Sequence, residues 1–79
     1  MDTKQTIIKI MSELFGISED KITLESGIGD FPKWDSLGHI NLLQEIQDEL
    51  DIEFEPEEII ELENVEDIIN LATKKENDK

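Results

Sequence analysis

The chain has 79 residues and carries 21 Asp and Glu against 7 Lys and no Arg, which gives a net charge of −14. A chain this short supports one small core, and a surface this acidic excludes nucleic acid and anionic membranes as good partners while favouring proteins with basic surfaces. Because cysteine is absent, disulfides, thiolate metal sites and thiol catalysis are excluded as well.

The first segment has the apolar spacing of an amphipathic helix. Its apolar residues recur on one helical face: Ile7, Ile8, Met11, Leu14 and Phe15. This predicts a helix over about residues 3–15, with Gly16 as its C-terminal cap. Lys9 interrupts the apolar run, so it is not a signal peptide, and no run of the chain reaches membrane-spanning length. We therefore expect a cytoplasmic protein without membrane insertion, and a monomer.

Residues 17–34 show no sustained periodicity and include Gly27, Gly29 and Pro32. Isolated apolar side chains in this stretch predict a long ordered loop that is pinned to the core. Trp34, at its end, is expected to be a hydrophobic plug that fixes the loop onto the following helix.

Three more helices are predicted downstream. The first covers about 36–50 and has Asp35 as its N-cap candidate, the second is short and covers about 56–61, and the third covers about 64–73. Residues 74–79 are expected to form a polar tail. The prediction is one domain over residues 1–79: an all-α, small four-helix bundle with a long loop between helices 1 and 2 and a short third helix.

Ser36 stands where the long loop gives way to the helix over 36–50. The positions that share its seam of that helix are largely apolar: His39, Leu43, Ile46 and Leu50. If Asp35 caps the helix, the Ser36 hydroxyl has no structural role, and the helix dipole would favour an anion attached to it. The alternative is that Ser36 is itself the N-cap.

The wider pattern is "DSL" opening a helix, then "GHINLLQEIQDELDIEF", an acidic short helix and "NVEDIINLA". Over about residues 7–73 this pattern resembles the acyl carrier protein family. The resemblance implies that a phosphopantetheinyl transferase uses coenzyme A to attach 4′-phosphopantetheine to Ser36, between Asp35 and Leu37. The thiol of that arm would carry acyl groups as thioesters, so the chain is expected to be a carrier and not an enzyme.

The resemblance also implies a docking face and a cargo site. Acidic residues on the second and third helices would dock basic surfaces on acyl-loading and acyl-transferring enzymes: Glu45, Asp48, Glu49, Glu53 and Glu58. An acyl chain could fold back along three seam residues: His39, Leu43 and Ile46. Housekeeping members commonly carry acidic residues where this chain has Gly38 and Asn41, and a small residue where it has Trp34. We therefore expect a specialised carrier, in a secondary-metabolite, surface-polysaccharide or modified-lipid pathway rather than in primary fatty-acid synthesis.

Two alternatives stay open. The chain could carry an aminoacyl or peptidyl cargo, or it could be an unmodified acidic helical adaptor in which Ser36 is only a cap. A hydrolytic dyad of Ser36 and His39 is disfavoured because no position supplies the third orienting group and Trp34 replaces the first Gly of G-x-S-x-G. His39 is instead expected to be an amphipathic residue at the rim of the bundle. The acidic clusters lack the spacing of a calcium-binding loop, so no metal site is predicted.

Overall fold

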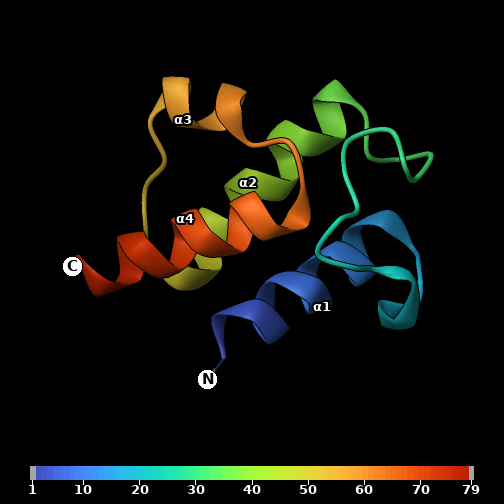
Figure 1. Cartoon of the computed structure of the whole chain (residues 1–79), viewed down its shortest axis with the longest axis horizontal. Coiled ribbons are helices and arrows are strands. Elements are labelled where there is room, and N and C mark those ends of the chain that lie inside the picture. Colours follow the sequence, from blue (N-terminus) through green and yellow to red (C-terminus); the bar gives the residue numbers. More distant parts are fainter. Residues whose placement is uncertain (1, 79) are drawn as a thin grey trace.

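A computed structural model describes residues 2–78 and confirms the all-α fold with four helices (Figure 1). The elements follow in chain order: α1 Thr3–Phe15, the 3₁₀ helix η1 Glu19–Lys21, α2 Ser36–Leu50, α3 Pro56–Glu61 and α4 Val65–Asn77. Within the described residues, no helix is both long enough and apolar enough to cross a membrane.

The helix ends follow from side chains that satisfy free backbone groups. The Asp2 carboxylate accepts from the Lys4 amide at the start of α1, and Gly16 ends that helix with a left-handed φ of 67°. Asn64 caps α4 by accepting from the amide of Asp67 at 2.8 Å. At these three helix ends the boundary is therefore set by residues that lie close to it in the sequence.

The fourth helix is longer than its sequence predicts, because it continues to Asn77 instead of ending near residue 73. Lys74 and Lys75 lie in its last turn, where positive charge is favoured by the helix dipole. Lys75 pairs with Glu58 of α3 at 2.9 Å, and the Thr3 hydroxyl donates to the Glu76 carboxylate. The expected polar tail is therefore helical up to Asn77; Lys79 lies outside the described residues.

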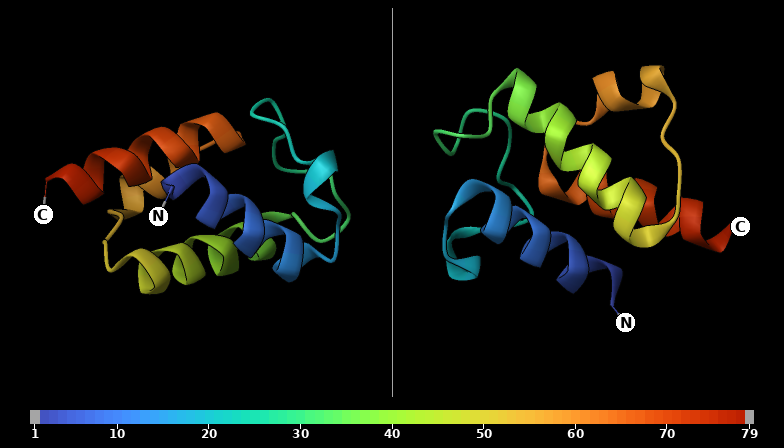
Figure 2. Two further views of the ribbon diagram at one scale, coloured as in Figure 1. Left: turned by 90° about the horizontal axis from the view of Figure 1, so that it is seen from below. Right: turned by 180° about the vertical axis from the view of Figure 1, so that it is seen from behind.

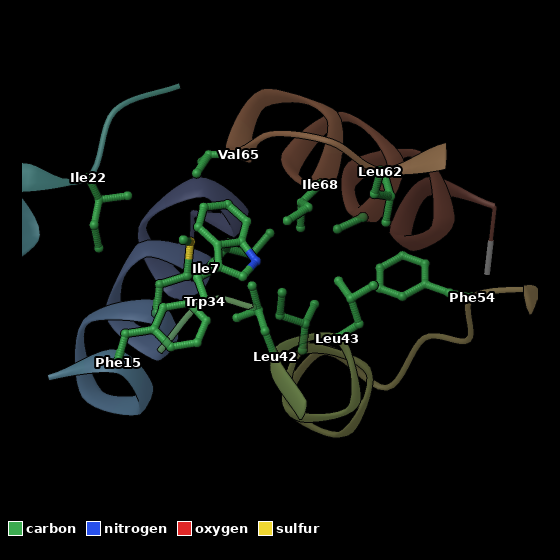
Figure 3. Packing of buried hydrophobic residues seen from close by; sticks show 13 residues of the cluster. Ile7, Phe15, Ile22, Trp34, Leu42, Leu43, Phe54, Leu62, Val65 and Ile68 are labelled. Carbon is green, nitrogen blue, oxygen red and sulfur yellow. The ribbon is translucent and has the colours of Figure 1, made fainter. Parts of the chain in front are cut away.

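The helices enclose one core. Figures 1 and 2 show α1 and α3 on opposite sides of α2 and α4, with the long loop across the end of the bundle where α2 begins. Figure 3 shows apolar side chains from the helices and the loop meeting between them. The cluster consists of Ile7, Met11, Phe15, Ile22, Trp34, Leu42, Leu43, Ile46, Phe54, Leu62, Val65, Ile68 and Ala72.

The long loop is held by backbone hydrogen bonds to the start of α4. The carbonyl of Ser26 accepts from the Val65 amide at 2.9 Å, and that of Leu24 accepts from the Glu66 amide at 3.0 Å. These two amides are first-turn donors that the helix itself cannot satisfy. The loop is thus an ordered part of the fold, as the sequence predicts, and it gives α2 a fixed starting point.

Candidate functional site

The N-cap of α2 is Asp35, and Ser36 is the first residue of the helix. Asp35 has extended backbone angles, and its Oδ1 accepts from the Gly38 amide at 2.8 Å. The Ser36 side chain is exposed and makes no hydrogen bond to any residue in the range 2–78. The alternative in which Ser36 caps the helix is therefore wrong, and its hydroxyl is free to react.

The surroundings of Ser36 favour an attached anion. The backbone amides of Ser36 and Leu37 have no acceptor in the described part of the chain, and they lie at the positive end of the α2 dipole. Leu37 is 67% exposed and Ile40 47% exposed, so the hydroxyl is flanked by accessible apolar surface. A phosphoester at this position would meet free amides on the helix side and open solvent on the other.

The loop residue Trp34 lies in the core and confirms its predicted role as a plug. Its side chain has no exposed surface and stacks on Phe15 and Phe31, with ring centroids 5.8 and 6.2 Å apart. Figure 3 shows the indole beside Ile7 and Phe15. Its Nε1–H donates to Nδ1 of His39 at 3.1 Å, which ties the loop to the first turns of α2.

His39 differs from the sequence expectation, because it is buried and not at the rim of the bundle. Only 5% of the residue is exposed, and its ring stacks on Trp34 with centroids 6.2 Å apart. Since Nδ1 accepts from Trp34, the proton of the neutral ring is on Nε2, which lies near the backbone of Ile59 but forms no hydrogen bond of good geometry to any described residue. Burial lowers the pKa of His39 below its ordinary value, and the backbone of Ile59 offsets part of this effect. The pair with Trp34 is therefore the neutral-pH arrangement.

Gly38 lies directly beneath the carbonyl of Lys33. A Cβ on Gly38 would stand 2.0 Å from that oxygen and 3.4 Å from Asp35 Oδ1. Only a residue without a side chain allows the loop to approach the helix this closely. The sequence analysis identified Gly38 as a departure from a family pattern but missed this contact, because the contact depends on how the loop folds back.

The predicted docking residues fall into two groups. Four of the five are exposed: Glu45, Asp48, Glu49 and Glu53. Glu58 is half-buried, and its carboxylate accepts from the Glu55 amide at 2.8 Å and pairs with Lys75. The Glu55 amide first, and then Lys75, hold the pKa of Glu58 below its ordinary value. The structure therefore gives Glu58 a role in fixing α3 against α4.

The expected cargo seam is closed in this structure. Leu43 and Ile46 have no exposed surface and belong to the core, on the same helix as Ser36. A hydrocarbon chain could enter between α2 and its neighbours only by displacing these side chains. The core around these two side chains is mostly aliphatic.

A family model described as "Phosphopantetheine attachment site" matches residues 5–72. This range includes the whole of α2, with Asp35 and Ser36 at its start, the complete loop before it and α3.

Proposed function

The chain belongs to the family of carrier proteins that hold a covalent 4′-phosphopantetheine, and from that premise we propose that Ser36 is the attachment residue. One observation carries the assignment: the Ser36 hydroxyl is exposed and unbonded at a helix N-terminus whose cap is supplied by Asp35. Its Oγ would form a bond to the phosphorus of the incoming group, while coenzyme A loses the nucleotide as leaving group and the hydroxyl proton passes to the transferase. The arm supplies a terminal thiol, and this chain supplies position and recognition.

The test is the intact mass of the purified protein before and after incubation with coenzyme A, magnesium and a promiscuous phosphopantetheinyl transferase. We expect the wild type to gain one phosphopantetheine and Ser36→Ala to gain none. Because Ser36 makes no side-chain bond, Ser36→Ala should change the free energy of unfolding by less than about 0.5 kcal/mol. Ser18→Ala is the matched control: it removes an exposed serine in the loop and should gain mass like the wild type. A wild type that stays unmodified while a control carrier is modified would contradict the assignment.

We also propose that the exposed carboxylates of α2 and the following loop dock the enzymes that act on the arm. Glu45, Asp48, Glu49 and Glu53 are solvent-accessible, and no Lys or Arg lies between Trp34 and Thr73. Family members in general work with a phosphopantetheinyl transferase and partner enzymes, and basic patches on such partners would complement this surface.

Charge reversal tests the docking proposal in the same modification assay. Glu45→Lys should lower kcat/KM for modification about three- to tenfold at low salt, and the difference from wild type should shrink as salt screens the charges. Asp78→Lys is the control, since it makes the same charge change at the end of α4, away from the start of α2 (Figure 1). An equal loss in both variants would indicate an effect of net charge and not of a docking face.

For the cargo we propose an acyl chain in a specialised pathway. The support is the aliphatic seam of Leu43 and Ile46, together with Asn41 at a position where the housekeeping pattern is acidic. A long acyl chain buried in the seam would raise the melting temperature above that of the unloaded carrier, whereas a small aminoacyl group would leave it unchanged. Comparing the two loaded forms distinguishes these cargo classes.

A further inference from the structure

We propose that the Trp34–His39 hydrogen bond positions Ser36 for the enzyme that modifies it, so that efficient modification requires a neutral His39. This inference rests on the proposed function of Ser36 and adds two positioning residues to it. Neither residue is expected to touch the reacting atoms, because both side chains are buried whereas the Ser36 side chain is exposed.

The start of α2 is fixed from both sides of Ser36. Two residues before it, Trp34 is locked in the core, and its carbonyl accepts from the Gly29 amide at 2.8 Å. One helical turn after it, His39 receives the Trp34 indole N–H at 3.1 Å. The contact of the Lys33 carbonyl with Gly38 closes the same loop onto the same turn. Residues 35–38, Ser36 among them, thus lie between two anchors, Trp34 and His39, that a single side-chain bond joins.

That bond exists in only one protonation state. Nδ1 of His39 can accept a hydrogen bond only while it carries no proton, and an indole N–H can only donate. When His39 takes a proton, two N–H groups face each other across the 3.1 Å contact and must separate. Because Trp34 is fully buried among aromatic rings, this separation shifts the loop relative to α2 and changes where Ser36 is presented.

Burial, and not a neighbouring charge, dominates the pKa of His39. Three segments contact the pair: the loop over residues 30–35, α1 through Phe15 and α3 through the backbone of Ile59. Their charged residues are Asp30, Lys33 and Asp35 on the loop, Lys4, Lys9 and Glu13 on α1, and Glu57, Glu58 and Glu61 on α3. Within the described residues none of them hydrogen-bonds His39, and Glu58 is already paired with Lys75. Burial moves the pKa of His39 below its ordinary value of 6.5. Protonation therefore occurs on the acidic side of neutrality, and modification should be fully efficient above it.

The proposal is tested by measuring initial rates of Ser36 modification with the transferase and coenzyme A, between about pH 5.5 and 8. The rates are compared for the wild type and two variants of His39. His39→Asn keeps an acceptor near the Nδ1 position but does not titrate, and His39→Leu has no acceptor. At pH 8 we expect the Asn variant to retain most of the wild-type kcat/KM and the Leu variant to lose about tenfold, mainly through KM. Taking the ratio of wild type to Asn at each pH removes the pH dependence of the transferase. This ratio should fall on acidification towards the Leu-to-Asn ratio, because protonated His39 has no acceptor at Nδ1.

Two further variants separate positioning from stability. Trp34→Phe keeps a ring in the stack but removes the donor, so it should behave like His39→Leu even if the latter folds poorly. Ile68→Val removes one methyl group from a fully buried core residue on α4 and should keep a wild-type rate and pH profile at comparable stability. A loss of rate in Ile68→Val equal to that in Trp34→Phe would assign the effect to stability and overturn the proposal.

A readout without the transferase is available because the chain has a single Trp and a single His. In NMR spectra the indole N–H of Trp34 should be protected from solvent exchange at neutral pH. It should lose this protection, and the Ser36 amide signal should shift, in the same titration step as the His39 ring.

Equal kcat/KM for the Asn and Leu variants at pH 8 overturns the proposal whatever the pH profile. If the wild type gains no mass while a control carrier does, the proposed function of Ser36 fails instead, and the NMR titration still reports on the pair.

Discussion

Replacing Trp34 with alanine is expected to lower the free energy of unfolding by about 3–5 kcal/mol, the range for removing a large aromatic side chain from a core. Trp34 is fully buried, stacks on Phe15 and Phe31, and donates its indole N–H to His39. The substitution leaves a cavity and an unpaired Nδ1 on a buried ring. In a domain of this size such a loss is comparable with the total stability, so we expect partial unfolding at 37 °C.

Urea denaturation followed by far-UV circular dichroism measures this effect, since Trp34→Ala removes the only fluorescent tryptophan. Trp34→Phe should lose only about 1–2 kcal/mol, because it keeps the ring but not the hydrogen bond. Ile60→Ala is the surface control: Ile60 is 81% exposed and should change the free energy of unfolding by less than about 0.5 kcal/mol. A loss below about 1 kcal/mol for Trp34→Ala would mean that the loop does not depend on this plug.

The helices could be predicted because their determinants are local. Asp35 and Asn64 each accept an amide three residues ahead, and Gly16 adopts the left-handed conformation that ends a helix. The spacing of apolar residues then assigns the faces of α1 and α2. The end of α4 could not be predicted in this way, because the bonds of Lys75 and Glu76 go to α3 and α1, which are distant in the sequence.

In the candidate site, too, features set by the local sequence could be predicted, whereas features set by contacts between separate elements could not. The position of Ser36 after its cap follows from the sequence around residue 35, and periodicity correctly places His39 on the inward seam. The type of residue was misleading, since a lone histidine near a helix end suggests the rim. His39 is buried because Trp34 of the loop packs against it and donates a hydrogen bond to its Nδ1. Glu58 forms an ion pair because α4 places Lys75 beside it. Both facts depend on contacts between separate elements, which periodicity does not encode.

Substituting alanine for Gly38 is expected to destabilise the protein by about 1–3 kcal/mol, the usual range for an overpacked site. The sign is opposite to that of an ordinary helical glycine, where alanine gains about 1 kcal/mol. The reason is space: the new Cβ would stand 2.0 Å from the Lys33 carbonyl oxygen, so the loop must retreat from α2. Urea denaturation gives the loss of stability, and the fluorescence of Trp34, one residue from Lys33, reports whether the loop has moved.

Asn41 provides the matched control, because it is exposed on the same helix. Asn41→Ala should leave stability unchanged or raise it by a few tenths of a kcal/mol, in keeping with helix propensity. If Gly38→Ala were equally neutral, the close approach of the loop would not be a constraint on this fold.

Positions 38 and 41 both differ from the acidic pattern of housekeeping carriers, but the two differences have different physical origins. Asn41→Glu should be tolerated, since an exposed carboxylate there only adds to the negative face of α2. Gly38→Glu should destabilise at least as much as Gly38→Ala, because its Cβ meets the same carbonyl and its charge is added beside Asp35. An acidic residue at position 38 is therefore incompatible with a loop seated on α2 in this way, whereas position 41 is open to either choice. Gly38 is required by the way Trp34 and Lys33 anchor the start of α2. Of the two positions, only residue 41 can therefore vary with the partner.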